Sequence, residues 1–327
     1  MPLREQELQR WLVETCGLDG CRLEPASEDA SFRRYYRVFL PDGTTRIAMD
    51  APPEREDCRP FVEVARRLRE PGVHVPEIHA QDLEQGFLLL EDLGDQSYLQ
   101  ALDEETVERL YGDALGALMT MQACVSAEDL PPYDRELLME EMELFRHWLL
   151  EEHLSMALTG ADEAMLDEAF ALLADSALEQ PQVFVHRDYH SRNLMAGVSP
   201  NPGVLDFQDA VRGPVTYDLV SLLRDCYIRW PDQQVEEWAW GHFQLAVQSG
   251  VLREEDEKRF MRWFDLMGIQ RHLKAAGIFA RLYHRDGKPG YLPDVPRTLG
   301  YVVDVARKYP ELQALSDFVE ERVLSAL

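Results

Sequence analysis

Basic residues, and lysine above all, are scarce in this sequence of 327 residues. It has 33 Lys plus Arg against 60 Asp plus Glu, a formal net charge of -27, and its four lysines all follow residue 257. A chain this acidic lacks the positive surface that binds a nucleic-acid backbone or an anionic membrane. We therefore expect neither nucleic acid nor a membrane among its partners.

Cysteines and long hydrophobic runs are also few. The five cysteines include no C-x-x-C pair, so they predict neither a disulfide framework nor a zinc site. The longest apolar stretches, such as 87–90, are far shorter than the roughly 20 residues of a membrane-spanning helix. Residues 1–17 mix charges with apolar positions, unlike a signal or transit peptide. We expect a soluble, reduced, cytoplasmic protein, and a monomer.

The first hundred residues have the pattern of a small sheet. Apolar side chains recur at helical spacing over 3–16, and aromatic and β-branched runs on both sides of the turn at 41–43 predict a two-stranded antiparallel hairpin within 22–50. A helix over 58–69 and two more strands within 73–93 follow. The prediction is an antiparallel sheet with one crossing helix.

Long helices dominate after residue 98. The periodicity predicts helices over 104–124, 134–158, 161–178, 215–229, 233–249, 254–284, 295–308 and 311–325, interrupted by one β-rich hairpin segment at 183–210. The expected fold class is α+β and bilobal. A nucleotide-binding lobe would cover 1–93 and a helical catalytic and substrate lobe 94–327, with a cleft between them.

The strongest chemical signal lies in the β-rich segment. The run HRDYHSRN at 186–193 is followed by Asp206-Phe207-Gln208. Phosphoryl transfer from a nucleotide needs a carboxylate that accepts the proton of the attacking hydroxyl, and oxygen ligands that hold Mg²⁺ against the phosphates. Asp188 fits the first role. Asn193 and Asp206 fit the second, because Mg²⁺ prefers a few hard oxygen ligands.

These residues resemble the catalytic and metal loops of protein kinases, H-R-D-x-x-x-x-N followed by D-F. The aminoglycoside phosphotransferase and choline kinase family is a still better match. Its typical motifs are H-x-D-x-H-x-x-N, D-x-x-x-A and G-x-x-x-x-D-L, which this chain resembles at His190, Ala210, Gly213 and 217–219. The resemblance implies a protein-kinase-like fold that uses ATP and Mg²⁺. It also implies that Asp218 tethers the catalytic loop through backbone amides.

Any one of these residues alone is more often a turn or cap residue than a catalyst. The joint occurrence of Asp188, Asn193, Asp206 and Asp218 at the family's spacing favours a kinase-like site. We interpret His186 as structural, and His190 as either a support of the loop or a substrate contact.

The nucleotide side departs from the kinase pattern. Residues 27–35 contain no glycine, and the third-strand lysine of kinases is replaced by Met49 or Asp50. An arginine must therefore contact the phosphates, and Arg33 or Arg34 is the candidate, with Ser31 donating beside it. Both arginines could equally be solvated strand residues.

Two further predictions concern the same lobe. In the connector, the backbone of Glu91 and Leu93 would meet the adenine edge. Glu63, on the predicted helix over 58–69, could be the orienting acid of kinases.

Three segments resemble a narrower group, the bacterial kinases of cell-wall recycling: 31–37, 50–53 and 268–288. Members of this group phosphorylate the anomeric hydroxyl of N-acetylmuramate and N-acetylglucosamine. The missing lysine would then be a trait of the group. An anomeric hydroxyl is more acidic than an ordinary sugar alcohol, so a carboxylate base such as Asp188 suffices. N-acetylmuramate carries a carboxylate and needs a local cation. The predicted substrate-binding residues are His190, Asp209, Arg224, Arg271 and Arg281, although each arginine could instead pair with a surface acid.

Two other functions stay open at this point. The chain could be a kinase of the same family that acts on choline, an aminoglycoside or another small alcohol. It could also be a nucleotide-binding pseudokinase, although the presence of Asp188, Asn193 and Asp206 argues against lost chemistry.

Overall fold

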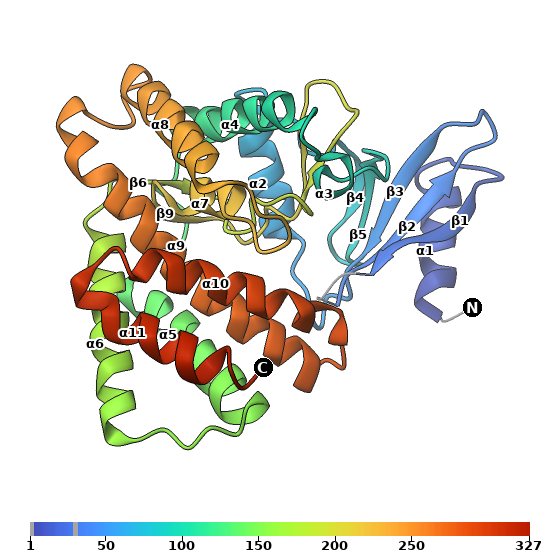
Figure 1. Ribbon diagram of the computed structural model, residues 1–327. Coiled ribbons are helices and arrows are strands. Elements are labelled where there is room, and N and C mark those ends of the chain that lie inside the picture. The colour runs from blue at the N-terminus through green and yellow to red at the C-terminus, as the bar shows by residue number, and fades with distance from the viewer. Residues whose placement is uncertain (1–2, 29–31) are drawn as a thin grey trace. The chain divides into compact units, whose positions relative to one another are not determined.

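The computed structural model describes residues 3–28 and 32–327, which divide into two compact units (Figure 1). Unit 1 comprises Met1–Ala101 and Leu194–Asp209, and unit 2 comprises Leu102–Asn193 and Ala210–Leu327. The sequence did not predict that a segment near residue 200 belongs with the N-terminal part. The predicted lobe boundary after residue 93 stays a prediction.

Unit 1 is built on an antiparallel sheet with the strand order β1-β2-β3-β5-β4. The strands are β1 (Arg22–Glu28), β2 (Arg34–Phe39), β3 (Thr45–Asp50), β4 (Ile78–Asp82) and β5 (Phe87–Glu91). The helices of this unit are α1 (Leu3–Glu14), α2 (Arg59–Arg69) and α3 (Tyr98–Ala101). The predicted hairpin is confirmed, because β2 and β3 pair from Phe39 with Thr45 to Arg34 with Asp50.

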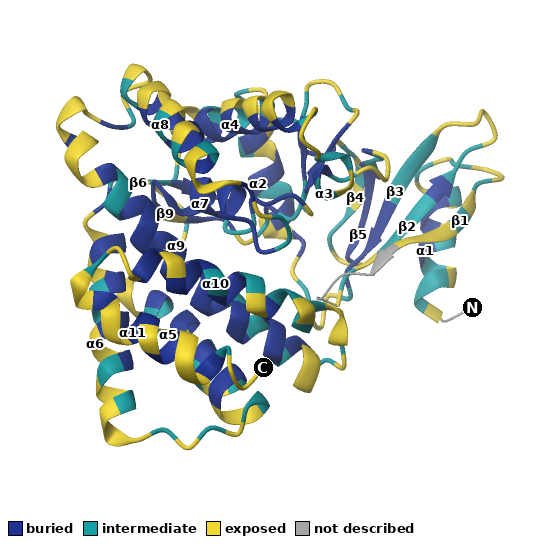
Figure 2. Cartoon of the chain, viewed as in Figure 1, coloured by how far each residue is buried: buried dark blue, intermediate teal, exposed yellow. Residues whose placement is uncertain are grey.

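One face of this sheet packs on α1, and Figure 2 shows β5 mostly buried. Side chains alternate between the two faces of a strand, so Ala48 and Asp50 share the α1 face while Met49 points to the other face. Arg4 of α1 donates from Nε to Asp50 Oδ1 at 3.1 Å. The apolar cluster on this face contains Leu8, Trp11, Leu12, Val38, Ala48, Phe87 and Leu89.

Unit 2 is mainly helical. Its α-helices are α4 (Val107–Cys124), α5 (Arg135–Leu144), α6 (Gly160–Leu178), α7 (Tyr217–Leu223), α8 (Asp232–Gln248), α9 (Glu257–His284), α10 (Val295–Ala306) and α11 (Gln313–Phe318). The π-helical segments η1 (Phe145–His153) and η5 (Val319–Val323) continue α5 and α11, and short 3-10 turns are η2 (Glu254–Asp256), η3 (Pro289–Asp294) and η4 (Pro310–Leu312). No helix of residues 3–28 and 32–327 is long and apolar enough to cross a membrane.

The long helix α9 approaches the junction of α5 and η1 very closely at Gly277. A Cβ placed at this glycine would lie 2.3 Å from the backbone carbon of Leu144 and 2.4 Å from the amide nitrogen of Phe145. Only glycine fits such a backbone contact without displacement. This packing fixes α9, which carries Arg271 and Lys274, against α5.

The helix predicted over 215–229 is too long, because α7 ends at Leu223 and Arg224 has the non-helical angles φ -117° and ψ 57°. Asp225 explains the early end. Its carboxylate accepts hydrogen bonds from the backbone amides of Ser191 and Tyr227, both at 2.9 Å. Such local bonds compete with helical ones.

The β-rich segment forms two small antiparallel sheets instead of the single predicted hairpin. In unit 2, β6 (Gln182–Val185) pairs with β9 (Val211–Pro214). In unit 1, β7 (Leu194–Met195) pairs with β8 (Gly203–Val204). The polar run at 186–193 is therefore a loop that leaves β6 and ends at β7.

Candidate functional site

The loop at 186–193 is tethered by Asp218, which lies in the first turn of α7. The backbone amides of His186 and Arg187 donate to its two carboxylate oxygens at 2.6 and 3.0 Å. Burial raises the pKa of Asp218 to about 6, against the opposing effect of His186 and of the two amides. The tethering role that the family resemblance implied for Asp218 is confirmed.

Two helices hold the turn that presents Asp188. Arg187 has a φ of 78°, a left-handed conformation that residues with side chains seldom adopt. Its guanidinium donates to Glu141 of α5 at 2.5 Å, and Lys274 of α9 lies 2.8 Å from the same carboxylate oxygen. Tyr133 also donates to Glu141. Burial acts to raise the pKa of Glu141, but Lys274 and Arg187 outweigh it and the pKa is lowered.

Several basic side chains act electrostatically on the carboxyl group of Asp188. Its burial acts to raise the pKa, while Lys274 is the strongest of the neighbours that lower it, with His190, Arg271 and Arg187 contributing in the same direction. The net shift of the pKa is downward. Asp188 is therefore ionised at neutral pH, as a proton acceptor must be.

Asn193 lies beside Asp188 in the same loop. Its Nδ2 donates to the backbone carbonyl of Asp188 at 3.0 Å. The amide of His190 also donates to that carbonyl, at 3.1 Å, and the amide of Asn193 donates to the carbonyl of His190 at 2.9 Å. The structure thus brings these two predicted residues together in unit 2, and Oδ1 of Asn193 is the atom suited to a metal.

His190 is buried next to an aromatic ring. Its ring lies 5.3 Å from that of Tyr227, and burial lowers the pKa of His190 to about 4. The imidazole is therefore neutral at pH 7. Its Nδ1 is buried without a hydrogen-bond partner among the described residues.

Asp206 and Arg33 lie together in unit 1. Asp206 has a φ of 61°, and its Oδ1 accepts from Gln208 at 2.9 Å and lies 3.7 Å from a guanidinium nitrogen of Arg33. The next residue, Phe207, packs on Phe61 of α2 with ring centroids 4.7 Å apart. Arg34 differs from Arg33 because it is exposed at the start of β2.

The other predicted nucleotide-side residues have local partners. Glu63 is partly exposed and accepts hydrogen bonds from Arg66 and Arg67, which lower its pKa to about 2. The backbone amide of Glu91 donates a hydrogen bond to the carbonyl of Glu77. The carbonyl of Glu91 and the amide of Leu93 therefore remain as the predicted adenine contacts. Ser31 lies outside the described residues.

The predicted substrate residues are placed differently from one another. Arg224 is buried, donates to Asp265 at 2.7 Å and lies over the ring of Phe264. Arg271 is buried with a guanidinium nitrogen 3.5 Å from the sulfur of Cys226. Arg281 is half-buried on α9, and Asp209, in unit 1, accepts from Gln208 at 3.3 Å.

Sequence reasoning missed Glu141 and Lys274. Lys274 follows Arg271 by one helical turn in a chain with only four lysines, and that scarcity is the signal that could have drawn attention to it. Glu141 offers no comparable signal, because it is one of 60 acidic residues.

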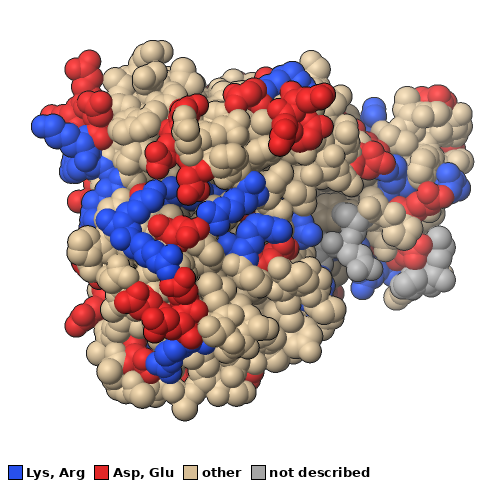
Figure 3. Space-filling view, in the orientation of Figure 1, with Lys and Arg blue, Asp and Glu red and all other residues tan. Residues whose placement is uncertain are grey.

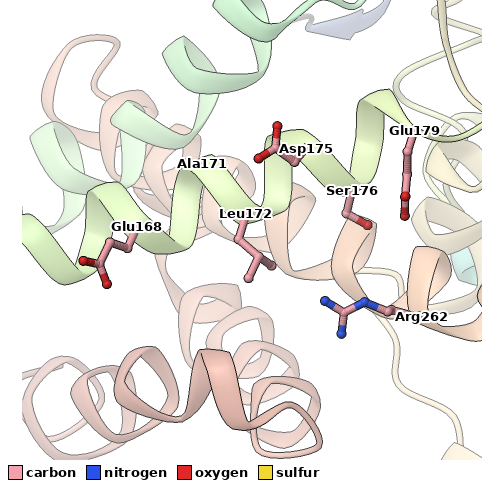
Figure 4. Close-up of a pocket in the computed structure, with 7 residues that line it drawn as sticks. All are labelled: Glu168, Ala171, Leu172, Asp175, Ser176, Glu179 and Arg262. Atoms are coloured by element: carbon pink, nitrogen blue, oxygen red, sulfur yellow. The ribbon is translucent and has the colours of Figure 1, made fainter.

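A separate surface pocket in unit 2 holds none of the predicted site residues (Figure 4). It lies along α6 and is lined by Glu168, Ala171, Leu172, Asp175, Ser176, Glu179 and Arg262. Two of its carboxylates already bind other side chains, because Trp263 donates to Glu179 and Arg135 to Asp175. We therefore place the candidate site at the loop and not at this pocket.

Comparison with known proteins identifies the family of this chain. Residues 22–264 match the model of the phosphotransferase enzyme family. The chain is 50% identical to a protein of Pseudomonas putida named N-acetylmuramate/N-acetylglucosamine kinase, over 98% of this chain and 96% of that one. A protein of Neisseria meningitidis with the same name is 40% identical, again over 98% and 96%.

Solved structures share the fold. The choline kinase LicA from Streptococcus pneumoniae has a TM-score of 0.65 at 14% identity and covers 92% of this chain and 99% of its own. The ADP-bound aminoglycoside phosphotransferase APH(2'')-Ib has a TM-score of 0.59 at 15% identity, with 91% and 98% covered. The predicted α+β, protein-kinase-like fold class and the resemblance to these kinases are confirmed. The chain belongs to the phosphotransferase enzyme family.

Proposed function

We propose that this protein is an ATP-dependent kinase that phosphorylates the anomeric hydroxyl of N-acetylmuramate and N-acetylglucosamine, in the recycling of peptidoglycan. The observation that carries the proposal is the loop that Asp218 tethers by two backbone amides, in which Lys274, Arg271 and Arg187 lower the pKa of Asp188. The names of relatives at 50% and 40% identity support the choice of amino sugar.

Asp188 would act as the general base. Its carboxylate would accept the proton of the sugar hydroxyl while that oxygen attacks the γ-phosphorus of ATP and the bond to the departing ADP breaks. The anomeric hydroxyl is the most acidic hydroxyl of a free sugar, so a carboxylate with a low pKa can serve it. Lys274 and Arg271 would keep the carboxylate ionised.

The family implies Mg²⁺, and two side chains fit it. Asn193 directs its amide nitrogen into the loop, and the carboxylate of Asp206 is 37% exposed, so both offer oxygen donors of the kind that Mg²⁺ prefers. When bound, the metal would neutralise charge on the phosphates. Asp206 and Asn193 would hold it.

Arg33 is our candidate for the role of the missing kinase lysine. Its guanidinium lies near Asp206, whereas Arg34 is exposed and begins a strand. Arg33 would bind phosphate oxygens with its fork of N–H donors. Met49, on the face of β3 opposite α1, has no charge with which to do so.

A substrate panel tests the proposal. The protein would be incubated with ATP, Mg²⁺ and, separately, N-acetylmuramate, N-acetylglucosamine, choline and kanamycin, and ADP release would be measured. We expect ADP with the two amino sugars. ADP only with choline or kanamycin would favour the other kinase functions. No ADP with any acceptor, together with no nucleotide-induced thermal shift, would refute an active enzyme.

A further inference from the structure

Arg192 lies in the same loop, between Asp188 and Asn193 in the sequence, and its guanidinium packs on two aromatic rings. Its guanidinium carbon is 4.1 Å from the ring centroid of Tyr227 and 5.1 Å from that of Tyr291. Phe279 of α9 joins the two tyrosines, with centroids 6.0 Å from Tyr227 and 5.7 Å from Tyr291. We call Tyr227, Phe279 and Tyr291 the aromatic cluster.

The charge of Arg192 is unmatched by any carboxylate in the part of the chain that the structure describes. Its side chain is exposed, and it forms no ion pair with a residue of 3–28 or 32–327. This is unusual on a surface where acidic side chains are spread widely (Figure 3). A guanidinium that rests its faces on rings keeps its in-plane N–H donors available, and that edge matches a carboxylate in two parallel hydrogen bonds.

The aromatic cluster lies close to Asp188. Arg192 follows Asp188 by four positions, so their Cα atoms are at most about 14 Å apart even in an extended chain. The turn bonds of His190 and Asn193 make the loop shorter than that. The ring of His190 also contacts Tyr227 at 5.3 Å. A sugar whose hydroxyl meets Asp188 could therefore reach Arg192 with a substituent on its ring.

We propose that Arg192 binds the carboxylate of the lactyl group of N-acetylmuramate, while the partly exposed ring of Tyr291, stacked on the buried Phe279, packs on the apolar face of the sugar ring. This rests on the proposed function and adds the residue that separates its two substrates, because N-acetylglucosamine has the same ring without the lactyl group. Arg192 is better suited than Arg224, whose guanidinium is buried on Asp265.

The test compares kcat/KM for both sugars in the full-length wild type, Arg192→Gln, Arg192→Lys and the control Arg109→Gln. Arg109 is an exposed arginine of α4 without a role in the site. We expect Arg192→Gln to lower kcat/KM for N-acetylmuramate by roughly 10- to 100-fold, mainly through KM, and that for N-acetylglucosamine by less than about threefold. Arg192→Lys should recover part of the loss, because it keeps the charge without the fork. Arg109→Gln should match the wild type.

Equal losses for both sugars, or no loss for either, would overturn the role of Arg192. So would a wild type that accepts N-acetylglucosamine alone, although the kinase function would then stand. A wild type that accepts neither sugar would instead refute the proposed function. Thermal melting checks each variant, and if Arg192→Gln does not fold, the ratio of the two sugars in Arg192→Lys decides.

Discussion

The loop at 186–193 in unit 2 and the sheet of unit 1 match the sequence pattern of kinases to different degrees. The loop retains Asp188, Asn193 and the tether Asp218, whereas the sheet lacks both the glycine-rich loop and the lysine. A proton acceptor must place one atom against one hydroxyl, so its residue type and position are tightly constrained. Neutralising a phosphate needs only a positive charge nearby, which another residue such as Arg33 can supply.

The third strand of the sheet, β3, shows how unit 1 departs from the sequence pattern of kinases. Asp50 is fully buried on the α1 face, where it pairs with Arg4. That ion pair stabilises the attachment of α1 and lies on the face opposite Met49. Asp50 therefore binds α1 to the sheet, whereas the lysine on the third strand of kinases contacts the phosphates.

The largest effect that we predict tests the loop. Asp188→Asn should lower kcat by roughly 10³-fold, because an amide cannot accept the proton, and should leave ATP binding nearly unchanged, because the base acts on the acceptor. Steady-state kinetics and a fluorescent-nucleotide titration would measure the two quantities. A variant with the wild-type rate would show that Asp188 is not the base.

A smaller effect tests the sheet. Arg33→Ala should raise the KM for ATP by roughly 10-fold through loss of a charge-assisted hydrogen bond to phosphate, whereas Arg34→Ala should change it by less than about twofold. The two variants are matched controls for each other. Equal, negligible effects would move the search to Arg37, which bonds Asp92 at 2.7 Å, or to Arg46.

The smallest effect concerns the pH dependence of stability, which we expect the buried histidines of unit 2 to control. In unit 2, burial lowers the pKa of His190 and His242 to about 4 and that of His272 to about 3. The unfolded chain has histidine pKa values near 6.5, so between pH 6.5 and pH 4 it binds protons that the folded state does not. The free energy of unfolding therefore falls as the pH falls through this window, by on the order of 1–2 kcal/mol per histidine at pH 5.

Asp218 opposes this trend, because its raised pKa of about 6 makes the folded state bind a proton more readily than the unfolded chain, which adds stability as the pH falls from 6. Three histidines outweigh one carboxyl group, so we expect a lower Tm at pH 5 than at pH 7.5. His242→Gln, which keeps a donor for Gln122, should reduce the difference. A Tm that is constant over this range, or equal pH dependence in the variant, would contradict the assignment.

How much of the molecule the sequence predicts depends on how local each feature is. The β2–β3 hairpin was predicted because its turn and strands are adjacent, and the Asp218 tether because the motif carries it. The end of α7 was missed because Asp225 reaches back to Ser191, a contact that periodicity does not contain.

The candidate site follows the same rule. Asp188 and Asn193 stand in one short loop and could be predicted together. The ion pair of Glu141 with Lys274 joins α5 to α9, which are far apart in the sequence. This pair depends on the packing of the two helices, which only the folded chain reveals.

The position of the transferred phosphate tests the proposed chemistry of Asp188 most directly. The product formed from ATP and N-acetylglucosamine would be examined by phosphorus-proton correlation NMR. We predict that the phosphorus couples to the anomeric proton, that the reducing end of the sugar is lost, and that Asp188→Asn forms this product roughly 10³-fold more slowly. A phosphate on any other hydroxyl, or the same product at the wild-type rate from Asp188→Asn, would contradict it.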